Sequence, residues 1–333
     1  MTLRFGLLGA GRIGKVHAKA ISADAGATLV AVADAMAPAA QAISAQYGCE
    51  VRTVDAILAS ADIDAVVICT PTDTHADLIE QFTKAGKAVF CEKPIDLSLD
   101  RVKACLAVVR ANKGTLMVGF NRRFDPHFMA VRAEIDKGSI GDVEMVTITS
   151  RDPGAPPVDY IKRSGGIFRD MTIHDFDMAR FLLGEEITEV AAMAAVLIDP
   201  AIGEAGDSDS VQVMLKTATG KMALISNSRR ATYGYDQRIE VHGSKGVVSA
   251  ENQRPVSIEV ANGLGYTRPP LHDFFMTRYT EAYAAEIAAF IASVSAKTAA
   301  APSGEDGLTA LALAEAALKS VAEGRSVKMS EIL

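Results

Sequence analysis

The sequence has few cysteines and no apolar run close to the roughly 20 residues that a membrane helix needs. Its four cysteines, Cys49, Cys69, Cys91 and Cys105, lack C-x-x-C spacing, so we expect neither a disulfide framework nor a metal site. Cys69 and Cys91 end apolar runs and are interpreted as buried free thiols in a reducing environment. The first residues, MTLRFGLLGAG, lack the regions of a signal peptide. We therefore expect a cytoplasmic protein without a membrane partner.

Positive charge is also scarce, because 34 lysines and arginines stand against 41 aspartates and glutamates, for a net charge of −7. This balance argues against a nucleic-acid-binding surface. The 333 residues are 49% apolar and 23% charged, as in an ordinary globular protein. A chain of this length suggests two domains, each with its own core.

The first third of the chain alternates short, nearly continuous apolar runs with helical patterns. Such runs suit parallel strands covered on both faces, and the alternation predicts an α/β, doubly wound Rossmann domain over residues 1–120. The expected strands are 3–8, 28–34, 65–70, 87–91 and 115–120, and the expected helices are 12–24, 37–47, 74–85 and 98–112.

The first strand leads directly into GAGRIG at residues 9–14. Gly9 permits a tight turn, Gly11 leaves room for a pyrophosphate, and Gly14 lets the following helix pack closely. The helix N-terminus then offers free N–H groups to the phosphates. The turn, including Arg12 and Ile13, is therefore predicted to bind a dinucleotide.

Asp34 ends the second strand 20 residues after Gly14, where a carboxylate can accept hydrogen bonds from ribose hydroxyls. It would repel a 2′-phosphate, and no Arg or Lys follows in AMAPAAQ, so NAD is favoured over NADP. Thr70 and Pro71 follow the third long strand and should line the nicotinamide side. His75, in the first turn of the next helix, is interpreted as a cap or packing contact rather than a catalytic group.

Two further stretches carry ionisable side chains with more than one interpretation. In CEKPIDL, Glu92 and Lys93 end a strand, so Lys93 points into the nicotinamide crevice unless it is a plain surface lysine. In GGIFRDMTIHDFDMARF, a regular helix would place Asp170, His174 and Asp177 within roughly a 60° wedge. A buried carboxylate beside an imidazole is either a satisfied core pair or a site, and the residues alone leave this open.

The pattern after residue 120 changes to a helix near 126–137 and a series of strands with hairpin signals. It predicts an α+β domain over residues 121–301 with a large, mostly antiparallel open sheet. The expected strands are 142–150, 187–198, 209–218, 221–229, 237–242, 247–250 and 255–260, and the expected later helices are 273–295 and 306–323. Residues 187–198 are apolar or small on both faces, which indicates a homo-oligomer.

Taken together, GAGRIG, Asp34, CEKP and GGIFRDMTIHDFD resemble the Gfo/Idh/MocA family of sugar and polyol oxidoreductases. The similarity spans nearly the whole chain and looks greatest towards the bacterial inositol 2-dehydrogenases. It implies a homotetramer and a final segment, about 302–333, that packs back on the first domain.

The resemblance also implies roles for individual residues. Lys93, followed by a cis bond to Pro94, would contact the reacting hydroxyl, while Asp170 and His174 would complete the catalytic set. The substrate positions implied are Arg122 (or its neighbour Arg123), Asp152 and Tyr235.

The implied reaction is the NAD-dependent oxidation of a ring hydroxyl of a cyclic polyol. Myo-inositol is the expected substrate, giving 2-keto-myo-inositol (scyllo-inosose) and NADH. In this reaction His174 would accept the hydroxyl proton, Asp170 would orient the imidazole, and Lys93 would stabilise alkoxide charge. The alternatives are another inositol isomer or a glucose-like pyranose, a non-catalytic NAD-sensing regulator, and an NAD-dependent lyase or glycosidase.

Overall fold

A computed structural model describes residues 2–333, which form two compact units, each built from two separate segments of the chain. The first unit contains the residues up to Asp125 and Glu281–Leu311, and the second contains Pro126–Thr280 and Ala312–Leu333. These bounds differ from the sequence expectation, which assigned 281–301 to the second domain and 312–333 to the first. Apolar side chains of 287–291 join the core of the first unit, while the last strand pairs within the sheet of the second.

The first unit is a parallel, six-stranded sheet in the order β3-β2-β1-β4-β5-β6, as the Rossmann prediction requires. All five expected strands are present. Unexpected are the two-residue edge strand β3 and the short helix α3, because segments of this length carry no readable periodicity. The strands are β1 (Leu3–Leu8), β2 (Ala27–Ala33), β3 (Glu50–Val51), β4 (Ala65–Ile68), β5 (Ala88–Glu92) and β6 (Leu116–Gly119).

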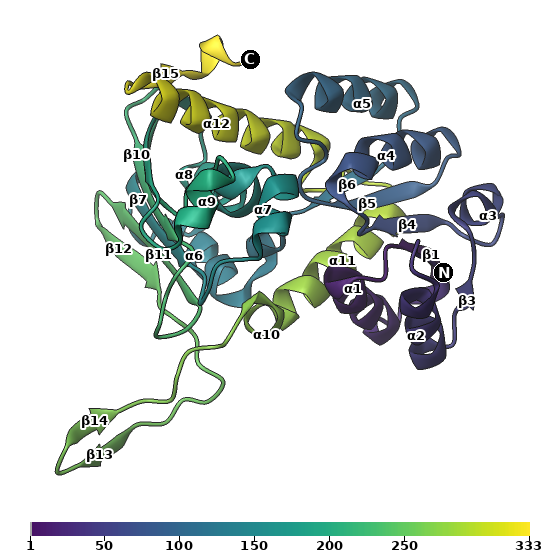
Figure 1. Ribbon diagram of the computed structural model, residues 1–333, viewed down its shortest axis with the longest axis horizontal. Helices are drawn as coiled ribbons and strands as arrows, with labels where there is room; N and C mark the ends of the chain where they lie inside the picture. Colours follow the sequence, from purple (N-terminus) through teal and green to yellow (C-terminus); the bar gives the residue numbers. More distant parts are fainter. Residues whose placement is uncertain (1) are drawn as a thin grey trace. The chain divides into compact units, whose positions relative to one another are not determined.

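Helices cover both faces of this sheet, which explains why its strands are apolar throughout. Figure 1 shows α4 and α5 on one face and α1, α2 and α11 on the other. Phe5, Phe90 and Phe290 meet in the core between the sheet and α11, with ring centroids about 6 Å apart. The helices are α1 (Arg12–Ala23), α2 (Ala37–Tyr47), α3 (Val54–Ala59), α4 (His75–Lys84), α5 (Leu99–Ala111) and α11 (Thr280–Ala296).

The second unit contains a seven-stranded sheet in the order β12-β11-β7-β10-β9-β8-β15. Its neighbouring strands are antiparallel except β7 and β10, which are parallel, so the expectation of a mostly antiparallel sheet is confirmed. The strands are β7 (Val143–Arg151), β8 (Ile187–Ala195), β9 (Ser210–Thr217), β10 (Met222–Ser228), β11 (Asp236–Gly243), β12 (Gly246–Ala250) and β15 (Val327–Lys328).

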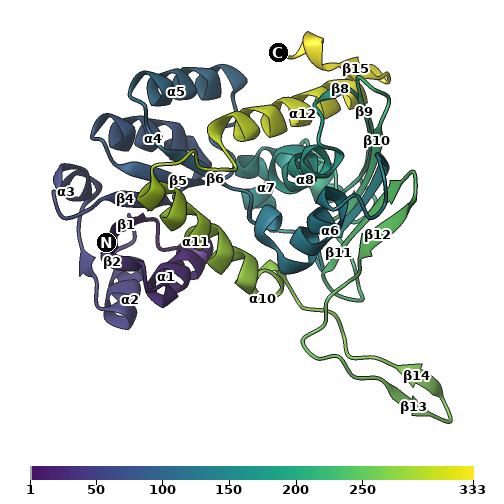
Figure 2. The ribbon, with the colours of Figure 1, turned by 180° about the vertical axis from the view of Figure 1, so that it is seen from behind.

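The strand expected at 255–260 is wrong. Only Val260 of that range is in a strand, where β13 (Val260–Asn262) pairs with β14 (Gly265–Thr267) in a separate hairpin. Figure 2 shows this hairpin extending away from the rest of its unit. Its strands are fully exposed, so the alternation of 255–260 reflects no buried face in this chain.

One face of the large sheet is covered by helices of the same unit. Helix α8 (Ile173–Leu183) packs on β7 and β10, and α6 (Pro126–Asp136) packs on β12. The remaining helices that begin in this unit are α7 (Val158–Ser164), α9 (Pro200–Glu204) and α10 (Phe275–Arg278), while α12 (Gly304–Glu323) enters it from the first unit. Among the described residues, no helix is both long and apolar enough to cross a membrane.

Candidate active site

The glycine turn between β1 and α1 has the geometry that a dinucleotide phosphate requires. Gly9 has φ +96°, a conformation that favours glycine. A Cβ on Gly14 would lie 2.0 Å from the Gly9 carbonyl oxygen, so only glycine lets α1 start this close to the turn. At Gly11 an added Cβ would meet nothing within 4 Å, so the backbone there is open to a ligand. The turn therefore fits the pyrophosphate of NAD.

Asp34 is held against this turn by two backbone donors. The amides of Ala10 and Met36 donate to its two carboxylate oxygens, at 2.5 Å and 2.7 Å. Each oxygen keeps acceptor capacity for a further donor. In the same turn Arg12 is exposed and Ile13 is half-buried.

The carboxyl ends of β4 and β5 carry Thr70, Pro71, Glu92 and Lys93, as expected for the nicotinamide side of a doubly wound sheet. Lys93 is half-buried, and its bond to Pro94 is cis.

The His75 ring contacts the backbone just after both of these strands. Its Nε2 lies 2.8 Å from the Thr70 carbonyl oxygen and its Nδ1 lies 2.8 Å from the Pro94 carbonyl oxygen. The ring is buried, which agrees with the packing interpretation of His75.

Asp170 lies in an irregular turn of its helix. The regular helix on which the wedge of Asp170, His174 and Asp177 was based begins only at Ile173, because Phe168–Thr172 form a π-helical segment. The expectation of a regular helix at Asp170 is therefore wrong, and the proximity of Asp170 to His174 stays a prediction. Such π-helical insertions occur frequently at functional sites.

Two side chains from other segments of the second unit hold the Asp170 carboxylate. The Tyr160 hydroxyl donates to one oxygen at 2.9 Å, and the Arg229 guanidinium donates to the other at 3.3 Å and 3.4 Å. Arg229 also lies 3.9 Å from Asp152, so both predicted aspartates share one buried guanidinium. Neither Arg229 nor Tyr160 was assigned to the site from the sequence, because the stretch around each carries no site motif.

The start of α8 is anchored to the sheet by a residue that sequence reasoning missed. Asp175 is fully buried and accepts hydrogen bonds from the Ser150 hydroxyl at 2.7 Å and the Asn227 amide at 2.8 Å. The neighbouring His174 is half-buried. Asp177, two residues after Asp175, is buried. Asp175 thus fixes the helical turn that carries His174.

The remaining predicted residues lie in two different units. Arg122 is buried in the first unit, where the adjacent Arg123 pairs with Asp306 at 3.0 Å. Although burial opposes it, Arg123 and the Ser303 backbone hold the pKa of Asp306 below its ordinary value. Tyr235 lies in the second unit, where its buried ring contacts Phe274 and Tyr279 at centroid distances of 5.9 Å and 6.0 Å. Arg123 is therefore held by an ion pair and the Tyr235 ring by aromatic contacts.

Comparison with known proteins places these features in one family. Residues 3–120 match the Gfo/Idh/MocA model described as the oxidoreductase family, NAD-binding Rossmann fold, and residues 132–329 match the model of its C-terminal alpha/beta domain. The chain is 77% identical to an inositol 2-dehydrogenase of Rhizobium meliloti (99% of this chain, 100% of the relative). It is 43% identical to a myo-inositol 2-dehydrogenase of Thermotoga maritima (99% and 100%).

A solved structure is similar over the full length as well. It is the scyllo-inositol dehydrogenase of Lactobacillus casei with bound NAD(H) and scyllo-inositol, which is 30% identical and has a TM-score of 0.92. The similarity covers 99% of this chain and 100% of that chain.

Proposed function

This chain belongs to the Gfo/Idh/MocA oxidoreductase family, and from that premise we propose how it oxidises its substrate. The chain binds NAD and has inositol 2-dehydrogenase activity. The observation that carries this assignment is the identity of 77% over 99% of the chain. Inositol oxidation removes a hydride from a ring carbon and a proton from its hydroxyl, and bound NAD supplies the hydride acceptor.

The isomer we propose is myo-inositol, giving 2-keto-myo-inositol and NADH. The relative that is 43% identical acts on myo-inositol by its name, whereas the scyllo-inositol enzyme of known structure is 30% identical. The test is NADH formation by the purified protein with inositol isomers, glucose-like pyranoses and their phosphates. Turnover of scyllo-inositol without turnover of myo-inositol would change the isomer and leave the reaction class intact.

We assign NAD binding to the glycine turn and the strand ends of the first unit. Gly9, Gly11, Arg12, Ile13 and Gly14 would surround the pyrophosphate, which the open space at Gly11 supports. Asp34, already held by the amides of Ala10 and Met36, would accept the ribose hydroxyls. The strand-end residues Thr70, Pro71, Glu92 and Lys93 would lie towards the nicotinamide.

We assign the proton transfer to His174, with Asp170 and Lys93 in supporting roles. A neutral imidazole is suited to accept a hydroxyl proton near physiological pH. Lys93 would donate a hydrogen bond to the reacting oxygen and stabilise the negative charge that develops on it. Asp170 is fixed by Tyr160 and Arg229, which supports a role that needs an oriented carboxylate.

We propose further polar side chains as contacts of the substrate hydroxyls. Asp152 and Arg229 lie near Asp170 in the second unit, and we keep Arg122 and Tyr235 as proposed contacts. Because Lys93, Asp170 and His174 are all present, a non-catalytic NAD sensor is disfavoured. Stoichiometric accumulation of NADH with a free polyol would separate a dehydrogenase from a lyase or glycosidase.

We propose a homotetramer that covers the outer face of the second unit's sheet. Residues paired across the strands share this face, including Met145 with Met222 and Met214 with Leu224. Its exposed apolar side chains are Met145, Met193, Met214, Met222, Leu224 and Val247. A continuous apolar face of this kind is unfavourable in water, and two copies can bury it by symmetric packing.

We propose the cytoplasm as the location. All four cysteines are free and buried, as expected of thiols kept in a reducing compartment.

A further inference from the structure

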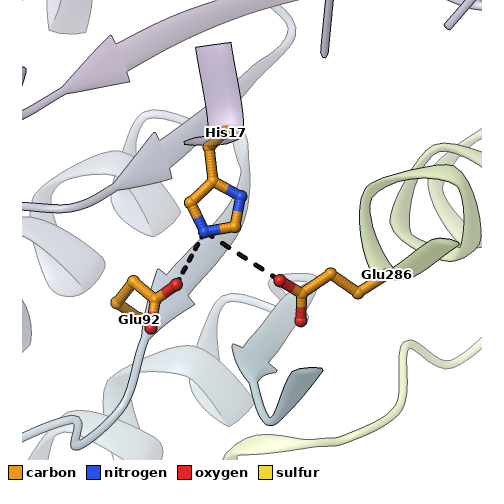
Figure 3. Close-up of side chains that lie close together, drawn as sticks. All are labelled: His17, Glu92 and Glu286. Carbon is orange, nitrogen blue, oxygen red and sulfur yellow. Dashed lines mark hydrogen bonds and ion pairs between the residues drawn. The ribbon is translucent and has the colours of Figure 1, made fainter. Parts of the chain in front are cut away.

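Three buried ionisable side chains of the first unit converge behind the strand end that carries Lys93. Figure 3 shows His17, Glu92 and Glu286 pointing toward one another. His17 lies on the buried face of α1, Glu92 ends β5, and Glu286 comes from α11. The His17 Nε2 lies 2.6 Å from the Glu92 carboxylate and 3.9 Å from that of Glu286. The cluster thus joins the helix of the cofactor turn to the strand of the lysine.

The spacing in this cluster is that of a hydrogen bond and not of a metal centre. Ligand bonds of about 2.0–2.2 Å in a tetrahedral zinc site keep neighbouring ligand atoms roughly 3.3 Å apart. The 2.6 Å between the His17 Nε2 and the Glu92 carboxylate is shorter than this and fits a direct hydrogen bond. The rings of Phe90 and Tyr283 pack against the His17 imidazole at centroid distances of 5.1 Å and 5.7 Å, which closes the cluster with apolar groups.

Glu286 occupies this cluster as a buried acid. Its side chain is fully buried, and neither carboxylate oxygen has a hydrogen-bond partner among the described residues. Burial, followed by the nearby Glu92 charge, raises the pKa of Glu286 well above its ordinary value. A neutral Glu286 can lie against the Glu92 carboxylate without the repulsion of a second negative charge.

The residues on both sides of Lys93 are immobilised by buried histidines. Glu92 is held by His17 on one side. On the other side its carboxylate packs on Gly119, where a Cβ added to the glycine would lie 3.2 Å from the carboxylate. The Pro94 carbonyl is held by His75. Lys93 is therefore a half-buried residue between two anchored neighbours. Its backbone is fixed on both sides, which helps to orient its ammonium group.

We propose that His17 and Glu286 are positioning residues for Lys93, which act through Glu92. The imidazole of His17 holds the Glu92 side chain at 2.6 Å, and Glu286 lies 3.9 Å from the same imidazole, so the two would fix the end of β5 just before Lys93. Both side chains are fully buried. This inference rests on the role proposed for Lys93 in the oxidation step.

A double-mutant cycle tests the coupling between His17 and Lys93. The measurement is single-turnover NADH formation with myo-inositol in the full-length protein, for His17→Ala, Lys93→Ala and the double variant. We expect His17→Ala to slow the step about tenfold or more, and to have little further effect once Lys93 is absent. Ile21→Ala is the matched control, because Ile21 is equally buried on α1 and has no polar side chain in the cluster. It should lower stability without a comparable loss of rate.

The outcomes separate this inference from the proposed function. If Lys93→Ala keeps the wild-type rate, the role of Lys93 fails. If Lys93→Ala slows the step and His17→Ala slows it by the same factor with or without Lys93, only the positioning role fails. A His17→Ala loss equal to that of Ile21→Ala would also overturn the positioning role, because it would then reflect packing alone.

Glu286 offers an independent variant if His17→Ala does not fold. Gln has the shape of a neutral glutamic acid, so Glu286→Gln should recover most of the rate that Glu286→Ala loses. Equal losses in the two variants would contradict a neutral acid at this position. Elemental analysis of the purified protein adds a second check, since a stoichiometric metal ion that is lost in His17→Ala would replace the hydrogen bond and overturn the inference.

Discussion

The guanidinium of Arg229 lies 3.3 Å from the Asp170 carboxylate, although 59 residues separate the two in the chain. The same guanidinium lies 3.9 Å from Asp152. A buried charge between two carboxylates holds both in fixed positions, so a change at Arg229 should affect the oxidation step through Asp170 and Asp152 together.

We expect Arg229→Lys to lower kcat/KM for inositol by roughly 10- to 100-fold, because a lysine keeps the charge but loses the planar fork. The neighbouring Arg230 is exposed, so Arg230→Lys is the matched control and should behave like the wild type. Steady-state kinetics at saturating NAD measure both. An equal response of the two variants would remove Arg229 from the site.

His174→Ala should lower the rate of hydride transfer by roughly 10²- to 10⁴-fold, the usual scale for loss of a general base. NAD binding should change little, because the glycine turn and Asp34 belong to the other unit. Single-turnover NADH formation measures the chemistry, and fluorescence titration measures NAD affinity. If the variant folds and oxidises inositol at the wild-type rate, His174 is not the general base.

Asp34→Ala should weaken NAD binding and raise the efficiency with NADP relative to NAD. The carboxylate is lost as an acceptor for ribose hydroxyls and as a source of repulsion for a 2′-phosphate. It is also lost as an anchor for the amides of Ala10 and Met36, so the turn itself should loosen. The measurement is kcat/KM for each cofactor, and an unchanged ratio would place the ribose elsewhere.

Glu286→Gln should gain stability relative to the wild type as the pH rises. The folded protein keeps the Glu286 proton, whereas the unfolded chain releases it above about 4.5, so the wild type loses stability with increasing pH. The groups that face Glu286 are His17, Glu92 and the thiol of Cys69, and all are retained in the variant.

Urea unfolding from pH 4 to 8 should therefore show a difference that grows by up to about 1.4 kcal/mol per pH unit above 4.5. The exposed Glu281 on the same helix provides the control, because Glu281→Gln should show no such trend. A flat difference for Glu286→Gln would mean that Glu286 ionises as readily in the folded protein as in the unfolded chain.

Met214→Glu on the outer face of the second sheet should dissociate the proposed tetramer. Met214 is 61% exposed in the single chain, and a buried carboxylate in a symmetric interface would be repeated in every copy. Light scattering coupled to size exclusion gives the mass. Met36→Glu, at a comparably exposed methionine of the first unit, should leave the mass unchanged. A monomeric wild type would end the proposal.

The sequence was most informative where structure repeats over many residues or a motif needs a particular atom. Each long strand and helix of the first unit was predictable, because the apolar period and the glycine turn are local signals. The position of Asp34 beside the glycine turn could be predicted from its place after β2. Short elements such as β3, and the irregular turn at Asp170, carry no such signal.

The partners of the predicted residues could not be predicted for a different reason. Tyr160 and Arg229 reach Asp170, and Ser150 and Asn227 reach Asp175, only because distant segments meet in the folded second unit. The parallel pairing of β7 with β10 brings Ser150 beside Asn227, and no local pattern encodes that register. The bounds of the two units were not predicted for the same reason. Long-range packing places α11 in the first unit, and long-range strand pairing places β15 in the second.

The division of each unit into two segments has a consequence for the order in which the protein is made. The chain passes between the units at 125–126, 280–281 and 311–312. During synthesis the cofactor unit lacks α11, with Glu286 and the core residue Phe290, until most of the chain has left the ribosome. Domains that are continuous in sequence can fold as they emerge, N-terminal first. Here we expect the nascent chain to complete its NAD site late, so a nonsense mutation near residue 280 should yield a product that cannot retain NAD.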